Sequence, residues 1–134
     1  MSAPEVQAYD LELRDGTRYR FNGQLLGRGS SERPDKDRWF EVYIYRNQSG
    51  TYILYTVGQS RLEDERPLIR LITTPSGFEV ADRLIVSHAG RVYVPSQSQR
   101  ALASAAQWDD DLLEAMRELP SMIATRQAGE LRVS

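Results

Sequence analysis

The sequence predicts an α+β fold, an antiparallel β-meander of about five to seven strands with C-terminal helices packed on one face. Two observations support this prediction. Strand-like segments with alternating apolar side chains, separated by glycine-containing turns, recur through residue 95. From residue 96 the apolar period becomes that of a helix. We therefore expect a single domain over residues 1–134, with sheet at about 6–95 and a helical segment at about 97–127.

The first two strands are predicted to pair through a three-residue loop. Residues 9–13 and 17–21 alternate cleanly around the turn signal Asp15-Gly16. A two-residue loop would place Glu12 opposite Tyr19 and mix the two faces, whereas a three-residue loop that ends in a left-handed glycine keeps each face uniform. The expected pairs are Tyr9 with Phe21, Asp10 with Arg20, Leu11 with Tyr19 and Glu12 with Arg18.

A second hairpin is the strongest strand signal in the sequence. Residues 39–46 and 51–57 are rich in β-branched and aromatic side chains and flank Asn47-Gln48-Ser49-Gly50. A four-residue loop predicts a core face on which Ile44 pairs with Ile53, Val42 with Tyr55 and Phe40 with Val57. The opposite face would then carry Trp39, Glu41, Tyr43, Tyr45, Tyr52, Leu54 and Thr56. Because both faces are apolar or aromatic, we expect this hairpin at the centre of the sheet or covered on both sides.

The remaining elements are shorter. Polar connectors occupy residues 27–38 and 58–67, and residues 68–72 are typical of a buried strand. Residues 78–86 fit either a strand or a short helix. A last hairpin is expected to pair 84–86 with 92–94 through the three-residue loop His88-Ala89-Gly90.

Two helices are expected in the C-terminal segment. Residues 97–106 are rich in alanine and glutamine. Asp109 or Asp110 would cap the next helix, whose apolar stripe consists of Leu112, Met116, Leu119 and Ile123. Pro120 would either kink this helix or begin a new one.

Composition excludes several classes of protein. With 27% charged residues and a formal net charge of −2, the chain is neither a disordered tail nor a strongly basic arm. It has no cysteine, which excludes disulfides, thiolate metal sites and cysteine nucleophiles. The first residues do not form a signal peptide, and no apolar run approaches the ~18 residues that cross a bilayer. We therefore expect a cytoplasmic protein with no membrane partner.

Arginine dominates the basic residues. There are 16 arginines and one lysine, Lys36. Guanidinium groups bind phosphates bidentately, so nucleic acid has to be considered as a partner. A GC-rich genome produces the same bias, and 19 acidic residues offset the arginines, whereas nucleic-acid-binding domains usually carry a basic excess. The bias alone therefore does not indicate a nucleic-acid partner.

No motif indicates catalysis, a cofactor or a metal. His88 is the only histidine, and it lies in a predicted turn without a nearby group to orient it as a base. The loop 27–31 has glycines but lacks the lysine and the following helix of a phosphate-binding loop. The acidic runs 109–111 and 63–65 are interpreted as a helix cap and a solvated charge run. We expect no catalytic, cofactor or metal residue.

The aromatic face of the second hairpin is the one candidate binding surface. Its predicted partner-binding residues are Trp39, Tyr43, Tyr45, Tyr52 and Arg46. Three interpretations are open: a second core layer under the C-terminal helix, a protein interface rich in Tyr, Trp and Arg, or a base-stacking surface for single-stranded nucleic acid.

Several segments resemble the EXLDI-type small proteins of bacteria, a family without an assigned function. The segments are Phe21–Leu26, Trp39–Tyr45, Ser49–Tyr55, Asp111–Glu114 and Leu119-Pro120. The family's N-terminal segment, which suggests DNA binding, has no counterpart here, and the tail 129–133 departs from the Glu-x-Leu-Asp-Ile signature. The resemblance implies a bacterial setting, in a mobile element or as an accessory protein, and transfers no functional residue.

Three functions are consistent with these observations. The first is a non-enzymatic bacterial binding protein that acts through protein–protein contacts, as a homo-oligomer or a subunit of a larger assembly. The second is a nucleic-acid-associated accessory protein that uses arginine and tyrosine on the sheet. The third is a hydrolase whose Asp/Glu-based site leaves no short motif.

Overall fold

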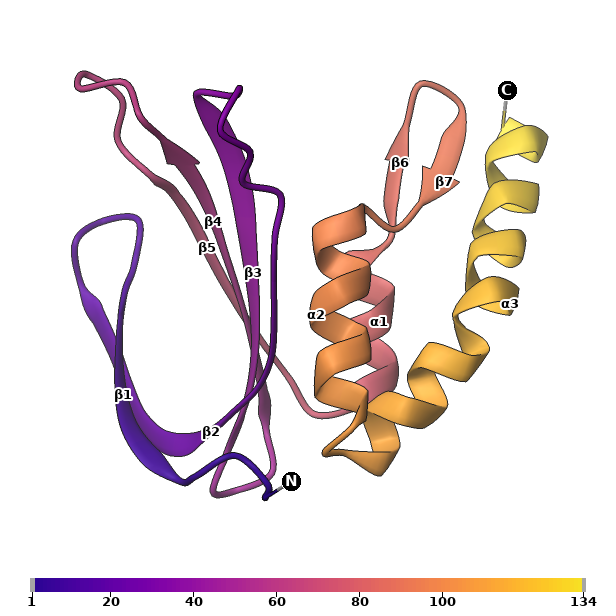
Figure 1. Cartoon of the computed structure of the whole chain (residues 1–134). Coiled ribbons are helices and arrows are strands. Elements are labelled where there is room, and N and C mark those ends of the chain that lie inside the picture. The colour runs from indigo at the N-terminus through magenta and orange to yellow at the C-terminus, as the bar shows by residue number, and fades with distance from the viewer. Residues whose placement is uncertain (1, 134) are drawn as a thin grey trace.

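The computed structural model describes residues 2–133 and contains one five-stranded antiparallel sheet (Figure 1). Its strands follow chain order as a meander. They are β1 (Gln7–Glu12), β2 (Arg18–Ser30), β3 (Arg38–Asn47), β4 (Tyr52–Ser60) and β5 (Leu68–Thr74). The chain continues with α1 (Gly77–Leu84), a small two-stranded sheet of β6 (Val86–His88) and β7 (Arg91–Tyr93), α2 (Ser96–Ala106) and α3 (Asp110–Val133). The predicted α+β meander with C-terminal helices is confirmed.

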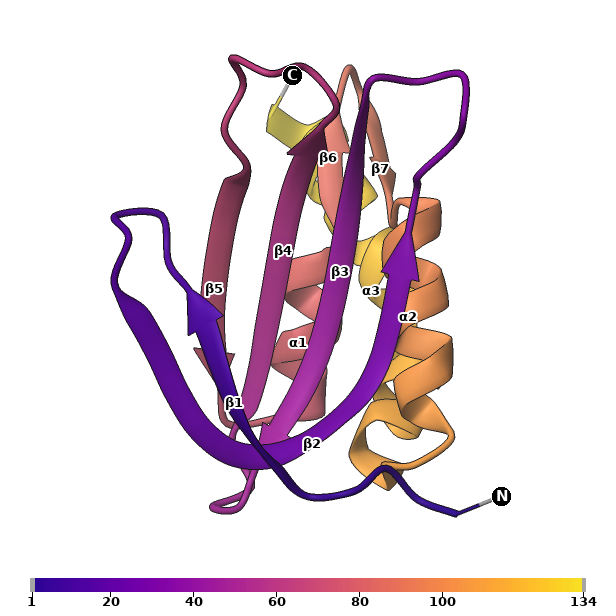
Figure 2. The ribbon, with the colours of Figure 1, turned by 60° about the vertical axis from the view of Figure 1, so that its left-hand side comes forward.

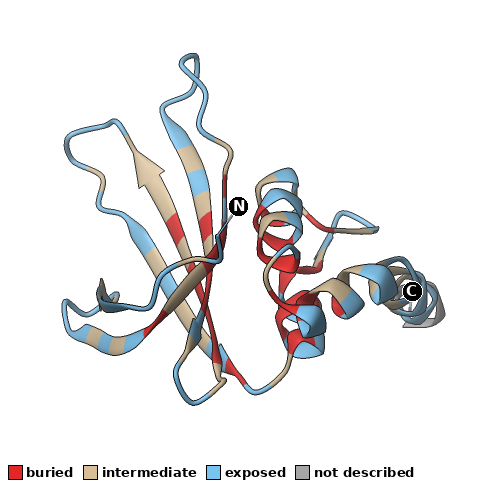
Figure 3. Cartoon of the chain, turned by 60° about the horizontal axis from the view of Figure 1, so that its bottom comes forward, coloured by how far each residue is buried: buried red, intermediate tan, exposed pale blue. Residues whose placement is uncertain are grey.

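The helices cover one face of the sheet. Helix α2 packs against β2 and β3, α1 contacts β4 and β5, and α3 lies outside them against α1 and α2 (Figures 1 and 3). The core of this layer is built from side chains such as Val42, Ile44, Leu54, Leu102 and Leu112, all of them buried. Burial of these aliphatic groups, at ~1.5–3 kcal/mol each, is the main force that holds helices and sheet together.

The opposite face is covered by the chain's own first hairpin. Strand β2 is long, carries a β-bulge between Leu25 and Gly27, and curves so that β1 and the first half of β2 fold back across the sheet (Figures 1 and 2). A second core forms there around Tyr45, Ile53 and Val57. Both faces of the β3–β4 hairpin are therefore covered, as its two apolar faces predict.

The register of the first hairpin is confirmed and that of the second is wrong by one residue. The four predicted β1–β2 pairs are all present. In the second hairpin Ile44 pairs with Leu54 instead of Ile53, and Tyr45 pairs with Ile53. The loop contains three residues, because the Asn47 N–H donates to the Thr51 carbonyl at 2.9 Å and Gly50 is left-handed (φ +88°). It therefore closes with the same glycine bulge as the first hairpin.

The last hairpin also differs from its prediction. Its loop has two residues, Ala89 and Gly90, both with positive φ, and Val86 pairs with Tyr93. The three-residue loop and the strand assignment of residues 84 and 85 are wrong, because the chain before Val86 forms a helix. Ser76 caps that helix by accepting a hydrogen bond from the Glu79 N–H at 3.2 Å.

Helix α3 begins at an aspartate cap and continues through its proline. Asp109 Oδ1 accepts the Leu112 N–H at 3.0 Å, so Asp109 is the capping residue of the two candidates. Pro120 lies inside the helix, and the helix axis changes direction along its length (Figure 1). The chain thus adopts a single bent helix, which is the effect of an interior proline.

Candidate functional site

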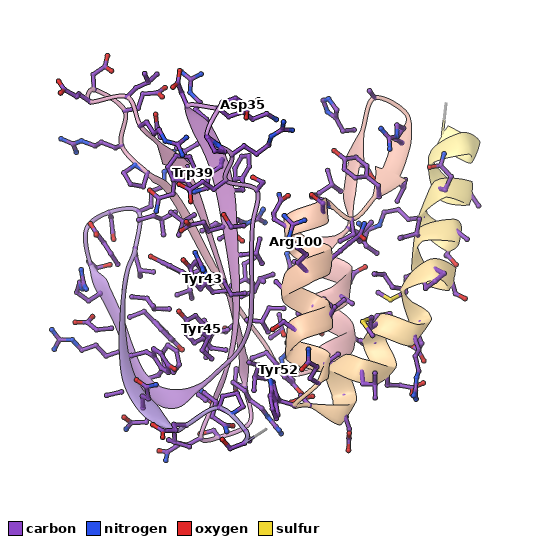
Figure 4. All side chains as sticks on the ribbon, viewed as in Figure 1. Asp35, Trp39, Tyr43, Tyr45, Tyr52 and Arg100 are labelled. Carbon is purple, nitrogen blue, oxygen red and sulfur yellow. The ribbon has the colours of Figure 1, made fainter. Side chains whose placement is uncertain are left out.

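The predicted five-residue binding surface does not form as one surface. The observed register places Trp39, Tyr43 and Tyr45 on the face covered by the first hairpin, whereas Tyr52 points toward the helices (Figure 4). Arg46 also points toward the helices, where it contacts Asp109. Tyr45 and Tyr52 are 5% and 1% exposed, so neither ring is accessible to a partner. The one-residue slip accounts for Tyr52, because such a slip moves every side chain of one strand to the opposite face. Arg46 follows Tyr45 in β3 and therefore points away from it.

Tyr52 and Arg46 instead hold helix α3 on the sheet. The Tyr52 hydroxyl donates to the carboxylate of Asp109, with oxygen–oxygen distances of 2.8 and 2.9 Å. An Arg46 guanidinium nitrogen lies 3.3 Å from the same carboxylate, which is 2% exposed. Burial, together with the neighbouring Asp109, raises the pKa of Tyr52 far above its ordinary value, so the phenol keeps its proton. This cluster of Arg46, Tyr52 and Asp109 is a structural connection between strand and helix.

On the other face, Glu41 is the centre of a polar cluster beside Trp39 and Tyr43. Its carboxylate accepts hydrogen bonds from Trp39 Nε1 at 3.1 Å and from the Tyr43 hydroxyl at 3.0 Å, and Gln59 and Arg28 lie at 3.4 and 3.8 Å. Burial acts to raise the pKa of Glu41, but these donors outweigh it and hold the pKa below its ordinary value. Glu41 is therefore ionised at neutral pH, which favours a structural anion over a general acid.

We expect the contribution of Glu41 to stability to disappear in acid. The pKa of an unfolded glutamate is about 4.3, and the pKa of Glu41 in the folded protein is lower. The ionised carboxylate therefore stabilises the folded state above the unfolded pKa, and this stabilisation is lost as the pH falls through the folded pKa. Glu41→Gln should therefore destabilise the protein at pH 7 and approach wild type toward acid, by urea unfolding across the pH range. If the difference in unfolding free energy between wild type and Glu41→Gln widened as the pH falls, the predicted direction of the pKa shift would be contradicted. Tyr43→Phe, which removes one donor, should show the same trend with a smaller amplitude.

The arginines that lie over aromatic rings of the β3–β4 hairpin already have partners within the chain. Arg61 lies over the Trp39 ring at 4.5 Å from its centroid and donates to the Lys36 and Arg33 carbonyls. Arg28 and Arg46 lie over the rings of Tyr43 and Tyr52, each at 5.5 Å. These stacked guanidinium groups occupy the ring faces on which a nucleic-acid base would have to stack.

A groove that the sequence did not predict lies on the helix-facing side of the sheet. Phe40 and Leu68 are 49% and 64% exposed on either side of Gly58, at the part of the sheet where residues 38–40, 58–60 and 65–68 meet. A Cβ atom at Gly58 would lie 3.2 Å from the Phe40 ring and 3.3 Å from Leu68 Cβ, so the glycine forms the floor. The groove has a volume of about 300 Å³ and also includes Trp39. We call it the Phe40–Leu68 groove.

The apolar character of both side chains predicts that they lie in the interior. The sequence predicts Phe40 opposite Val57 on the core face and Leu68 in a buried strand. The strand is present as β5, but Leu68 is exposed, and Phe40 is half exposed and pairs with Gly58. Phe40 does point to the helix side, but its strand partner there is Gly58, and no helix residue of the described chain lines the groove around this pair. The signal available in the sequence was the glycine at position 58, because glycine within a strand often marks a site of close approach.

Beside the groove, arginines without an acidic partner form a basic area. Arg66 borders the Phe40–Leu68 groove, and Arg70 and Arg83 line a neighbouring open cavity of about 600 Å³. None of these three takes part in an ion pair within the part of the chain that the structure describes. By contrast, Arg38 is paired with Glu65 at 2.7 Å.

Comparison with known proteins gives no further guide. No family model matches the chain, and neither a curated protein nor a solved structure matches it. The resemblance to EXLDI-type proteins therefore remains a prediction. Within the described residues, no three His, Asp or Glu side chains come together as a metal site, and no helix has the length and apolar character to cross a membrane.

Proposed function

We propose that this chain is a non-enzymatic bacterial binding protein that contacts a protein partner through the Phe40–Leu68 groove. One observation carries the proposal: two large apolar side chains face solvent across a groove that the chain itself leaves unfilled. Isolated exposed apolar residues are ordinary, but an apolar depression with a polar rim is typical of an interaction site. Arginine, which is enriched at interface hot spots, stands at its border as Arg38 and Arg66.

Affinity capture from the native host tests the proposal. We expect a protein partner that is retained after nuclease treatment by the immobilised wild-type chain. Phe40→Asp should reduce its recovery by about tenfold or more, because a charge in the apolar groove removes a hot-spot contact. The matched control is Val6→Asp, since Val6 is 57% exposed and lies outside the groove. It should capture the partner as wild type does.

Two results would contradict this function. Equal recovery by Phe40→Asp and wild type would place the contact elsewhere. Loss of all bound material on nuclease treatment would favour the nucleic-acid alternative, for which the unpaired Arg66, Arg70 and Arg83 are the supporting observation. That alternative also predicts a steep loss of binding with added salt, whereas an apolar groove predicts a small one.

A further inference from the structure

Strand β5 is an edge of the five-stranded sheet, next to the Phe40–Leu68 groove. It pairs with β4 on one side, and within residues 2–133 no strand pairs with it on the other. An edge of this kind presents unpaired N–H and C=O groups that match the backbone of an added strand.

The register identifies which groups point outward. The Asn47–Thr51 pair is hydrogen-bonded, and hydrogen-bonded and non-bonded pairs alternate along antiparallel strands. The residues of β4 that bond to β3 are therefore the odd-numbered ones, 53 to 59, and the even-numbered ones bond to β5. In β5 these partners are the even-numbered residues, so the outward groups are those of Ile69, Leu71 and Thr73. No other backbone hydrogen bond within the described chain engages them.

The two edges of the sheet differ in how they are protected. In β1 the same alternation makes Asp10 and Glu12 outward residues, and both lie close to Arg18 in ion pairs. Charges along an edge discourage pairing with another strand. Strand β5 has the sequence Leu-Ile-Arg-Leu-Ile-Thr-Thr, in which Arg70 is the one charged residue. Of the two edges, β5 is the one that accepts a further strand.

We propose that β5 binds an extended, acidic and apolar segment of the protein partner as a sixth strand of the sheet. The inference deepens the proposed function and rests on it, because the added strand would run beside the Phe40–Leu68 groove. Backbone pairing supplies the affinity, and the alternating side chains supply the specificity.

Charge and shape define the segment that fits. On its helix-facing side an apolar side chain would lie beside Leu68, and an acidic one two residues away would lie beside Arg70. Arg83 lines the same cavity as Arg70, and Arg66 precedes the strand, so the local unpaired charge is positive. Glu79 offsets part of it. The odd-numbered positions face the second core, where Ile69 and Leu71 favour an apolar neighbour.

The test uses a random peptide library displayed on phage, selected on the intact chain. We expect selected peptides to carry an Asp or Glu between apolar, β-branched residues, with a further apolar residue two positions from the acidic one. Thr73→Pro removes one outward N–H and leaves the bonds to β4 intact, so it should weaken a selected peptide by about tenfold. Thr73 is exposed, and proline is tolerated on a strand edge that faces solvent. The matched control, Thr73→Ala, keeps the N–H and should bind as wild type does.

Each outcome separates the inference from the proposed function. If Thr73→Pro, shown to be folded by urea unfolding, binds as tightly as Thr73→Ala, strand addition is overturned. If Phe40→Asp still weakens the same peptide, the groove remains the binding site and only the β5 inference fails. If neither variant changes binding, both fail. A wild-type dimer that Thr73→Pro dissociates would show that a second copy of the chain occupies the edge, and this would overturn the acidic partner segment.

Discussion

Replacing Asp109 by alanine is expected to lower the free energy of unfolding by about 3 kcal/mol. The substitution removes the N-cap of α3 and leaves the buried Tyr52 hydroxyl without its acceptor. Loss of a cap costs ~1 kcal/mol, and an unsatisfied buried polar group costs ~1–3 kcal/mol. Arg46 also loses its ion pair, but its half-exposed side chain remains hydrated. Urea unfolding followed by circular dichroism measures the change.

Two further variants show which contacts of Asp109 account for the lower free energy of unfolding. Asp110→Ala, at the exposed neighbouring position, should cost only ~0.5 kcal/mol through the helix dipole. Tyr52→Phe removes the hydroxyl donor and should cost ~1–2 kcal/mol. A double-mutant cycle of Asp109→Ala and Tyr52→Phe should show coupling, because the two groups contact each other. Additive effects, or equal losses for Asp109→Ala and Asp110→Ala, would contradict the buried network.

Gly29→Ala is the second substitution with a large expected effect, a loss of about 3 kcal/mol in the free energy of unfolding. Strand β2 lies against helix α2 so closely that a Cβ atom at Gly29 would meet the helix backbone, with Ala101 N at 2.9 Å and the Gln97 carbonyl still closer. A backbone cannot rotate away as a side chain can, so strand and helix must separate. The loss should appear as a lower urea midpoint with an unchanged slope.

The same substitution elsewhere serves as its control. Gly129 lies in helix α3 with nothing within 4 Å of its Cβ position. Gly129→Ala should raise the free energy of unfolding by ~0.5 kcal/mol through helix propensity alone. Opposite signs at the two glycines are the expected result. A neutral Gly29→Ala would show that the helix does not approach β2 as described.

The local sequence is sufficient to predict the register of a hairpin where the turn and the alternation of its two strands agree on one pairing. In the first hairpin, Asp15-Gly16 and the alternation from Tyr9 to Phe21 admit one register that keeps both faces uniform, and the structure has that register. The change of period near residue 96 likewise predicts α2 and α3, whereas α1 lies before it. In these segments the interactions that decide the structure lie within a few residues of each other.

The second hairpin shows where local reasoning failed. Both of its faces are apolar, so a one-residue slip exchanges two equally acceptable patterns and alternation cannot choose between them. The turn determines the register. The Asn47 side chain accepts hydrogen bonds from the N–H groups of Ser49 and Thr51, and the left-handed Gly50 closes the three-residue loop. The glycine-bulge rule used for the first hairpin would have given the correct register here.

The candidate site could not be found by local patterns. Phe40 and Leu68 have the sequence character of core residues, but they are exposed and no helix residue within residues 2–133 lines the groove around them. The outward groups of β5 depend in turn on the corrected register of β3 and β4. Both features arise from tertiary packing between segments far apart in the sequence.

Amide hydrogen exchange along β5 tests the central claim most directly, because it reports both the register and the open edge without a partner. We predict alternation: slow exchange at Arg70 and Ile72, whose N–H groups bond to β4, and fast exchange at Ile69, Leu71 and Thr73, whose N–H groups face solvent. Slow exchange at Ile69, Leu71 and Thr73 with fast exchange at Arg70 and Ile72 would contradict the register. Uniform protection would show that this edge is already covered.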